Sequence, residues 1–289
     1  MQFSKGISQL KMLLTGGTGF IGRNVLPELE KRFAVDAPSR SELNLLDEMS
    51  VESFVRKGSY DIVVHLANAT PAKNSVDKAE RILADSLRAY FNLRRNSDAF
   101  GKMLYIGSGA EYDKRFPIVY VSEDDIGRRI PIDDYGFAKY VMNEDARQSK
   151  NIFNLRIFGC YGPLDAKTKF IRDAIDCCLE DRAITIRQDC MFDYMYVKDL
   201  AEVIDHFAKS EPRFHDYNVC RGKRIALSEI ANIVAMKMKN PYPLDIAAQG
   251  WNKEYTASNA RLLNEFPDFI FTSIEDGIEN QIEWQRRTK

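Results

Sequence analysis

The sequence lacks any hydrophobic run long enough to cross a membrane as a helix. Such a helix needs roughly 20 consecutive apolar residues, and no stretch of the 289-residue chain approaches that length. Residues 1–5 also lack the apolar core of a secretory signal peptide. We therefore expect a cytoplasmic protein with no membrane partner.

The sequence also lacks an excess of charge of either sign. It has 41 basic and 42 acidic residues, which gives a formal net charge of −1. Proteins that bind nucleic acid carry clustered positive charge, because they must neutralise phosphates. We therefore expect no nucleic-acid partner.

The sequence contains few cysteines, and their number is odd. The five cysteines are an odd number, and their spacing does not match that of metal ligands. This pattern does not suit a disulfide framework and is typical of free thiols in a reducing compartment. We expect no metal site.

Apolar strand-like runs alternate with segments of helical periodicity through the first two thirds of the chain. The predicted strands cover residues 11–15, 33–37, 61–66, 102–107, 154–158 and 217–220, and the predicted helices cover 20–32, 49–56, 78–100, 135–149 and 199–209. This alternation predicts an α/β protein with a doubly wound parallel sheet. The remainder is less regular, with prolines between shorter elements, and ends in a helix with a Ser or Thr cap.

A glycine-rich stretch follows the first predicted strand and opens the first predicted helix. In "KMLLTGGTGFIG", Gly16 can make a tight turn, Gly19 can let the backbone approach a pyrophosphate, and Gly22 can let the helix pack closely. The helix N-terminus would face the phosphates. The spacing differs from the common G-x-G-x-x-G, and a glycine-rich turn without a ligand is the alternative.

A tyrosine and a lysine lie four residues apart in "YGFAK", where a helix is predicted. Tyr135 and Lys139 would share one face of that helix. The pKa of tyrosine is near 10, so an ammonium group beside it would favour the phenolate for acid–base work. Ser108 ends a predicted strand at the sheet edge where such folds bind ligands. The alternative is a pair of surface residues on a helix.

With further stretches included, the chain resembles the extended short-chain dehydrogenase/reductase family, also called the NAD-dependent epimerase/dehydratase family. The resemblance rests on the glycine stretch and on "HLAN", "GSGAEY", "YGFAK", "LRIFGCYGP" and "FDYMYVKDLAEVI". It implies a catalytic set of Ser108, Tyr135 and Lys139. It also implies a Rossmann domain of residues 1–162 and 191–222, with a smaller, interleaved substrate-binding region of residues 163–190 and 223–289.

The resemblance implies a nicotinamide cofactor. "SRSELNLLD" is similar to the matching stretch in the NADPH-using, GDP-fucose synthase-like branch of the family, and Arg40 can pair with a 2′-phosphate. Asp36 favours a free 2′-hydroxyl but is expected within the strand. NADP(H) is favoured and NAD(H) is the alternative. The expected cofactor residues are Gly16, Gly19, Phe20, Ile21, Gly22, Arg40, Asn44, Leu45, Leu66, Ala67, Tyr135 and Lys139.

The activity implied by the resemblance is reduction at C4 of a nucleotide-linked 4-keto-6-deoxy sugar. Ala110 stands where the GDP-fucose synthase-like branch has a catalytic cysteine, and Lys169 stands near that branch's histidine. Epimerisation beside the ketone is therefore not expected. The alternatives are a nucleotide-sugar 4-epimerase with tightly held NAD and a non-catalytic cofactor-sensing module. The expected substrate residues are Ser108, Gly109, Ala110 and Tyr161.

Two family positions are changed in this chain. An asparagine of the family is Gly159, and an arginine is Phe192, which weakens the match to a standard sugar nucleotide. The resemblance also implies a homodimer formed through the helices at 78–100 and 135–149. Leu83, Leu87, Tyr90 and Leu93 would form part of its face or would pack on the sheet.

Overall fold

The computed structural model describes residues 9–69 and 79–288. Its centre is a six-stranded sheet in which every pairing is parallel. The strand order is β2-β1-β3-β4-β6-β11. The strands are β1 (Lys11–Thr15), β2 (Ala34–Asp36), β3 (Tyr60–His65), β4 (Phe100–Ser108), β6 (Ile152–Ile157) and β11 (Asp216–Val219).

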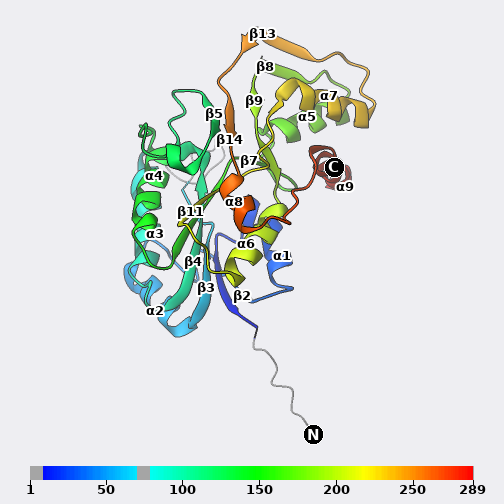
Figure 1. The fold of residues 1–289 in the computed structure, drawn as a ribbon. Coiled ribbons are helices and arrows are strands. Elements are labelled where there is room, and N and C mark those ends of the chain that lie inside the picture. The colour runs from blue at the N-terminus through cyan, green and yellow to red at the C-terminus, as the bar shows by residue number, and fades with distance from the viewer. Residues whose placement is uncertain (1–8, 70–78, 289) are drawn as a thin grey trace.

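Helices cover both faces of this sheet (Figure 1). One face carries α1 (Phe20–Leu29) and α6 (Asp199–Lys209), and the other carries α2 (Glu48–Gly58), α3 (Ile82–Arg94) and α4 (Asp134–Arg147). Along β3, Ile62 and Val64 join the core under α1 and α6, while Val63 joins the core under the other three helices. Burial on both faces explains the continuous apolar run of this strand. The predicted doubly wound α/β class is confirmed.

Most of the remaining elements lie beyond one end of the sheet, toward the top of Figure 1. Three helices there share a cluster of buried isoleucines that includes Ile175, Ile230 and Ile278. The helices are α5 (Phe170–Leu179), α7 (Leu227–Met238) and α9 (Ile274–Thr288). Ser273 Oγ accepts a hydrogen bond from Asp276 N at 3.0 Å, which is the cap expected for the last helix.

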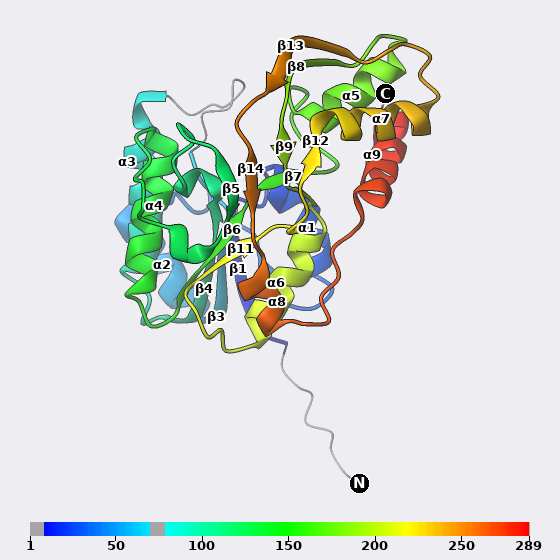
Figure 2. The ribbon, with the colours of Figure 1, turned by 45° about the horizontal axis from the view of Figure 1, so that its top comes forward.

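Short strands connect these outer helices to the central sheet (Figure 2). One small sheet has the order β12-β9-β14-β5, and two strand pairs, β10-β7 and β13-β8, lie beside it. The strands are β5 (Ile118–Val121), β7 (Gly159–Tyr161), β8 (Thr185–Asp189), β9 (Met191–Phe192), β10 (Tyr194–Tyr196), β12 (Ile225–Ala226), β13 (Asp245–Trp251) and β14 (Tyr255–Ala257).

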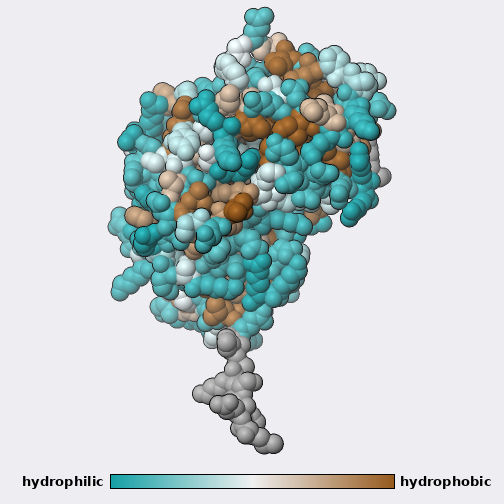
Figure 3. Space-filling view, turned by 45° about the vertical axis from the view of Figure 1, so that its right-hand side comes forward, coloured by the Kyte–Doolittle hydropathy of each residue, from teal (hydrophilic) through white to brown (hydrophobic). Residues whose placement is uncertain are grey.

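The domain division expected from the resemblance stays a prediction. Most of the outer cluster comes from residues 163–190 and 223–289. However, Leu262 of α8 (Ala260–Glu265) is buried in the core of the central sheet. The surface in Figure 3 is largely hydrophilic, with its larger hydrophobic patches in the upper half. No helix among the described residues is long and apolar enough to cross a membrane.

Two helices end three or more residues before their predicted ends. α1 ends at Leu29 instead of residue 32, and α3 ends at Arg94 instead of residue 100. Asn96 Nδ2 donates to Asn92 O at 3.0 Å, and turns follow until Phe100 begins β4. Residues 95–98 are all polar, so the prediction extended the helix beyond its apolar pattern. Residue 78, its predicted start, lies outside the described residues.

Two of the four residues predicted for the dimer face are buried in the core of the sheet. Tyr90 and Leu93 are fully buried there, and Tyr90 donates its phenol proton to Asp145 Oδ2 at 2.8 Å. Leu83 and Leu87 are partly buried against the same core. The alternative that these side chains pack on the sheet is therefore correct for Tyr90 and Leu93.

A buried ion-pair network joins β4, β6 and β11 beneath the carboxyl end of the sheet. Arg156 is fully buried and donates from Nε to Glu111 Oε2 at 2.6 Å and from an Nη to Asp216 Oδ2 at 3.1 Å. Asn154 Nδ2 also donates to Glu111 Oε2, at 3.0 Å. Burial raises the pKa of Glu111, and Arg156 opposes that rise. The guanidinium thus compensates two buried carboxylates.

Replacing Arg156 by methionine should lower the free energy of unfolding by about 3–5 kcal/mol, because it leaves buried carboxylates without their partner. Urea denaturation followed by circular dichroism measures this. Arg56→Met is the control, since Arg56 pairs with Glu52 and Asp98 on the exposed surface and should change stability little. Equal, small effects of the two substitutions would contradict the assigned role of the network.

Candidate functional site

The glycine turn after β1 is packed closely against neighbouring backbone. At two of its positions this backbone leaves no room for a side chain. Gly16 has φ +77°, and a Cβ there would lie 2.6 Å from Ala67 N. A Cβ at Gly22 would lie 2.3 Å from Gly16 O. A Cβ at Gly19 would meet only Gly16 O, at 3.4 Å. Gly19 therefore presents an open surface at the start of α1, as an approaching phosphate requires.

A cavity of about 380 Å³ opens over this turn, between β1 and β3 where the strand order reverses. We call it the glycine-loop cavity. Seven of the predicted cofactor residues line it: Gly16, Gly19, Arg40, Asn44, Leu45, Leu66 and Ala67. The exposed Arg40 guanidinium has no ion pair within the described part of the chain. It is thus available to an anionic ligand.

Asp36 is the last residue of β2, as expected, and its carboxylate is engaged away from this cavity. Oδ2 accepts the phenol proton of Tyr60 at 2.8 Å and lies 3.3 Å from Lys11 Nζ. Asp36 does not line the glycine-loop cavity.

His65 lies under the glycine turn as a structural residue. Its Nδ1 and Thr15 Oγ1 are 2.8 Å apart, which ties the end of β3 to the end of β1. Burial lowers the pKa of His65 to about 3, so the imidazole is neutral. A neutral imidazole held by a neighbouring strand supports the turn and does not act as an acid.

A second cavity, of about 770 Å³, begins where the first ends, at the start of α1. We call it the large cavity. Phe20 and Ile21 line it, together with Ser108, Ala110, Tyr135 and Tyr161. The Tyr161 hydroxyl donates to Ile274 O at 3.4 Å, so only its ring faces the space. Gly22, Gly109 and Lys139 lie behind these walls and line neither cavity.

Ser108 is held by a tight turn at the end of β4. Its Oγ accepts a hydrogen bond from Ala110 N at 3.1 Å, and its own N–H donates to Glu111 Oε1 at 3.0 Å. Glu111 is the carboxylate that Arg156 holds from below. The buried ion pair therefore fixes the backbone that carries the serine hydroxyl into the large cavity.

Tyr135 reaches the same cavity from the first turn of α4, which is capped by Asp133. Burial raises the pKa of Tyr135, and a hydrogen bond with Ser108 opposes that rise. The Lys114 ammonium lies 6.0 Å from the ring centroid. Ser108 and Tyr135, predicted from separate motifs, are thus brought together.

Lys139 lies about one helical turn after Tyr135 on α4. It is buried and its Nζ donates to Ile106 O at 2.6 Å, toward β4. Burial lowers its own pKa to about 8. The predicted effect of Lys139 on the pKa of Tyr135 stays a prediction.

The two changed family positions have a packing explanation. A Cβ at Gly159 would lie 2.5 Å from Asp193 O, so the close approach of β7 and β10 leaves no room for an asparagine. Phe192 stacks on Tyr194, with ring centroids 5.0 Å apart. An aromatic wall thus replaces polar groups on this side of the large cavity.

Sequence analysis missed several polar groups that line the large cavity, among them Asp165 and Tyr255. Asp165 is a buried carboxyl whose pKa is raised to about 6 by burial. Tyr255, on β14, is a second phenol close to Ser108. Neither lies in a recognisable motif, and Tyr255 reaches the site only because β14 pairs with β5 and β9.

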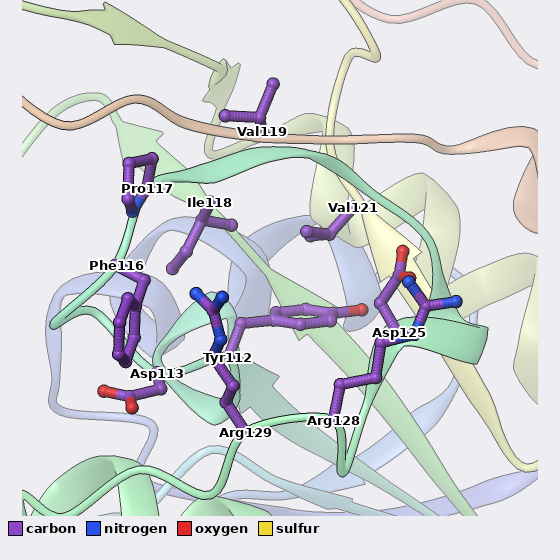
Figure 4. Close-up of a pocket in the computed structure, with 10 residues that line it drawn as sticks. All are labelled: Tyr112, Asp113, Phe116, Pro117, Ile118, Val119, Val121, Asp125, Arg128 and Arg129. Atoms are coloured by element: carbon purple, nitrogen blue, oxygen red, sulfur yellow. The ribbon is translucent and has the colours of Figure 1, made fainter.

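A smaller groove of about 390 Å³ adjoins the large cavity (Figure 4). Phe116 and Ile118 line both spaces and form the wall between them. On the groove side, the Arg129 guanidinium carbon lies 3.8 Å from the Phe116 ring centroid. The wall of the large cavity is therefore supported from outside by a stacked cation.

Comparison with known proteins agrees with the geometry. Residues 12–220 match the NAD dependent epimerase/dehydratase family. GDP-L-colitose synthase of Yersinia pseudotuberculosis is 22% identical over 304 residues, covering 95% of this chain and 97% of that protein.

Two solved structures have the same fold. A GDP-L-fucose synthetase of Naegleria fowleri bound to NADP has a TM-score of 0.83 at 16% identity, with 97% of this chain and 95% of that chain covered. MlghC, a GDP-mannoheptose C4 reductase of Campylobacter jejuni with NADP bound, has a TM-score of 0.81 at 16% identity, with 96% and 98% covered.

The burial of Lys139 predicts a specific pH dependence of stability. The pKa is about 8 when folded and about 10.4 when unfolded, so between these values the unfolded chain binds a proton that the folded chain does not. The free energy of unfolding of the wild type, relative to Lys139→Met, should rise by up to about 1.4 kcal/mol per pH unit in that window. The gain should be lost as the pH falls through 8. A difference that stays constant from pH 7 to 10.5 in urea denaturation would show that Lys139 is not buried as a titrating group.

Proposed function

The chain belongs to the NAD dependent epimerase/dehydratase family, and on that premise we propose that it reduces a nucleotide-linked 4-keto-6-deoxy sugar at C4 with NADPH. The observation that carries the proposal is the meeting of Ser108 and Tyr135 in the large cavity, directly beside the glycine-loop cavity. This places a proton donor next to a nucleotide-sized space.

The residues of the glycine-loop cavity fit a nicotinamide dinucleotide. The surface over Gly19 is open, and Gly16 and Gly22 hold the turn that exposes it. Arg40 offers an unpaired guanidinium, while Asp36 is already engaged. Gly16, Gly19 and the α1 N-terminus would hold the pyrophosphate, and Arg40 would hold a 2′-phosphate.

When bound, NADPH would supply the hydride for C4 of the sugar. Tyr135 donates its phenol proton to the ketone oxygen as the new alcohol forms. The Ser108 hydroxyl donates a hydrogen bond to the same oxygen and orients it. Since burial raises the pKa of Tyr135, the phenol is protonated before the reaction, as a proton donor must be.

Simple reduction suits the groups around Ser108. Ala110, two residues after the serine, lines the large cavity with a methyl group that cannot move a proton. Related proteins are named for activities on nucleotide sugars. GDP-L-colitose synthase is similar over nearly the whole chain, and the C4 reductase shares the fold. These names support a nucleotide sugar as the substrate.

We further propose that the protein is cytoplasmic and forms a homodimer through α3 and α4. With Tyr90 and Leu93 buried in the sheet core, the face would consist of the outward residues of these helices. Light scattering coupled to gel filtration measures the dimer directly.

The 4-epimerase is the competing proposal, and the cofactor found with the purified protein distinguishes the two. A reductase releases oxidised cofactor after each turnover, whereas a 4-epimerase keeps NAD through the cycle. Mass spectrometry of the purified, denatured protein tests this. Stoichiometric NAD that survives gel filtration would favour the epimerase, and consumption of NADPH with a 4-keto-6-deoxy nucleotide sugar would favour the reductase.

Replacing Tyr135 by phenylalanine should lower kcat by at least about 10²-fold, because it removes the proton donor. The dissociation constant for NADPH, measured by fluorescence titration, should stay the same. Tyr140→Phe, five residues further along α4, is the matched control and should keep full activity. Near-normal turnover of the Tyr135 variant would remove this residue from the reaction.

Replacing Arg40 by alanine should raise the dissociation constant for NADPH by about tenfold or more, because a charge-assisted hydrogen bond to the 2′-phosphate is lost. Affinity for NADH should change little, so NADH serves as the internal control. Equal losses for both cofactors would mean that Arg40 does not recognise the 2′-phosphate.

A further inference from the structure

Asp165 is a carboxyl group of the large cavity that the proposed reduction does not use. It lies in the loop between β7 and α5. Asn24 Nδ2 of α1 donates to Pro163 O at 2.7 Å, which ties this loop to the first helix. On the other side, the Arg172 guanidinium of α5 donates to Asp165 O. The carboxyl group is therefore carried by a loop that two helices hold in place.

The residue before Asp165 has a backbone conformation that is unfavourable for its side chain. Leu164 has φ +69°, in the left-handed region where residues other than glycine are uncommon. Such a conformation persists only where the surrounding structure enforces it, and it is found most often at functional sites. The contacts to α1 and α5 enforce it here.

The Asp165 carboxylate has one oxygen that no group in the described part of the chain occupies. Oδ1 accepts a hydrogen bond from Ala166 N at 2.8 Å, whereas Oδ2 has neither a hydrogen bond nor an ion pair. The residue is only 4% exposed, yet Oδ2 is not fully enclosed by protein, and Asp165 lines the large cavity. Burying a carboxylate without a partner is costly. A hydrogen-bond donor on a bound molecule would remove that cost.

A second polar group on the same wall is the hydroxyl of Tyr194, which also lines the cavity. Its ring stacks on Phe192 at a centroid distance of 5.0 Å and meets Tyr161 edge-on at 6.0 Å. Burial raises the pKa of Tyr194, and the nearby Asp165 raises it further, so the phenol stays protonated. Among the described residues its hydroxyl has no hydrogen-bond partner. The wall thus offers a carboxylate that accepts and a phenol that can donate or accept.

The charges around Asp165 favour a neutral hydroxyl over an ammonium group as its partner. Burial raises the pKa of Asp165 to about 6, and the hydrogen bond from Ala166 and the positive charges of Lys169 and Arg172 oppose that rise. The group is therefore mainly ionised at neutral pH, with two cations already near it. A third cation would be repelled by them. A hydroxyl can donate to Asp165 and accept from Tyr194 without adding charge.

This wall is separate from the place where Ser108 and Tyr135 meet. Asp165 is not among the groups that shift the pKa of Tyr135, and Tyr135 is not among those that shift the pKa of Asp165. A ketone oxygen at Ser108 and a hydroxyl at Asp165 would therefore be different groups of one substrate.

We propose that Asp165 is a specificity-determining residue, which accepts a hydrogen bond from a ring hydroxyl of the sugar in the large cavity, with Tyr194 beside it as a second partner. The assignment rests on the proposed function for the identity of the substrate as a nucleotide sugar. It gives a role to a residue that takes no part in hydride or proton transfer.

The kinetic test is Asp165→Ala with NADPH and a 4-keto-6-deoxy nucleotide sugar. KM should rise about tenfold or more, because a hydrogen bond to a charged group is lost, while kcat and NADPH affinity stay nearly unchanged. Asp165→Asn should lose less, since a hydroxyl can accept from the amide and an ammonium group cannot. Asp173→Asn is the matched control, because this carboxyl lies on α5 and lines neither cavity. An unchanged KM, or equal losses in the two Asp165 variants, would overturn the proposal.

A binding measurement that needs no turnover separates this proposal from the proposed function. Isothermal titration calorimetry would compare GDP-mannose with GDP, and UDP-glucose with UDP. In the wild type the sugar should strengthen the binding of at least one nucleotide. Asp165→Ala should remove most of that gain and leave the affinity for the nucleotide alone unchanged.

The two failures then look different. If Asp165→Ala removes the gain from the sugar while the wild type reduces no 4-keto sugar, the proposed function fails and the role of Asp165 stands. If the wild type reduces a 4-keto sugar but shows no gain, or a gain that persists in Asp165→Ala, the role of Asp165 is overturned and the function stands.

Discussion

The pairing of Glu111 with Arg156 is the constraint on which the site depends. Both side chains are fully buried, and the carboxylate also accepts from Ser108 N. A shift of the serine turn would therefore separate buried charges, which costs far more than a surface ion pair. The network also includes Asn154 on β6 and Asp216 on β11. Three strands of the sheet thus locate one hydroxyl group, and the rest of the large cavity is arranged around it.

A second constraint acts at the glycine turn after β1. At Gly16 a side chain would collide with the backbone of Ala67, and at Gly22 it would collide with the backbone of Gly16. This packing leaves the surface of Gly19 open at the point where the strand order reverses. The glycine turn and the serine turn are built independently, one from backbone contacts and the other from buried charge. The start of α1 lies between them, so a ligand that spans both cavities would meet a preformed surface at each end.

The sequence was sufficient for the fold class, because parallel strands buried on both faces leave long apolar runs that alternate with amphipathic helices. It also predicted that Ser108 and Tyr135 meet, since both lie at the carboxyl edge of the sheet. It did not predict that Lys139 contacts a carbonyl of β4, or that α3 ends at Arg94, where polar residues form turns. Tyr255 had no signal at all: its place depends on the pairing of β14 with β5, more than 130 residues earlier in the chain. Long-range pairings of short strands leave no local pattern to find.

The most direct test of the central claim is to follow a hydride from the cofactor to the sugar. The wild-type protein would be incubated with NADPH deuterated at C4 of the nicotinamide and with a 4-keto-6-deoxy nucleotide sugar, and the product would be examined by NMR and mass spectrometry. The account predicts deuterium at C4 of the sugar, from one face of the nicotinamide only, with NADPH consumed in equal amount. A product without deuterium, or no consumption of NADPH while the protein retains NAD and interconverts C4 epimers, would contradict it.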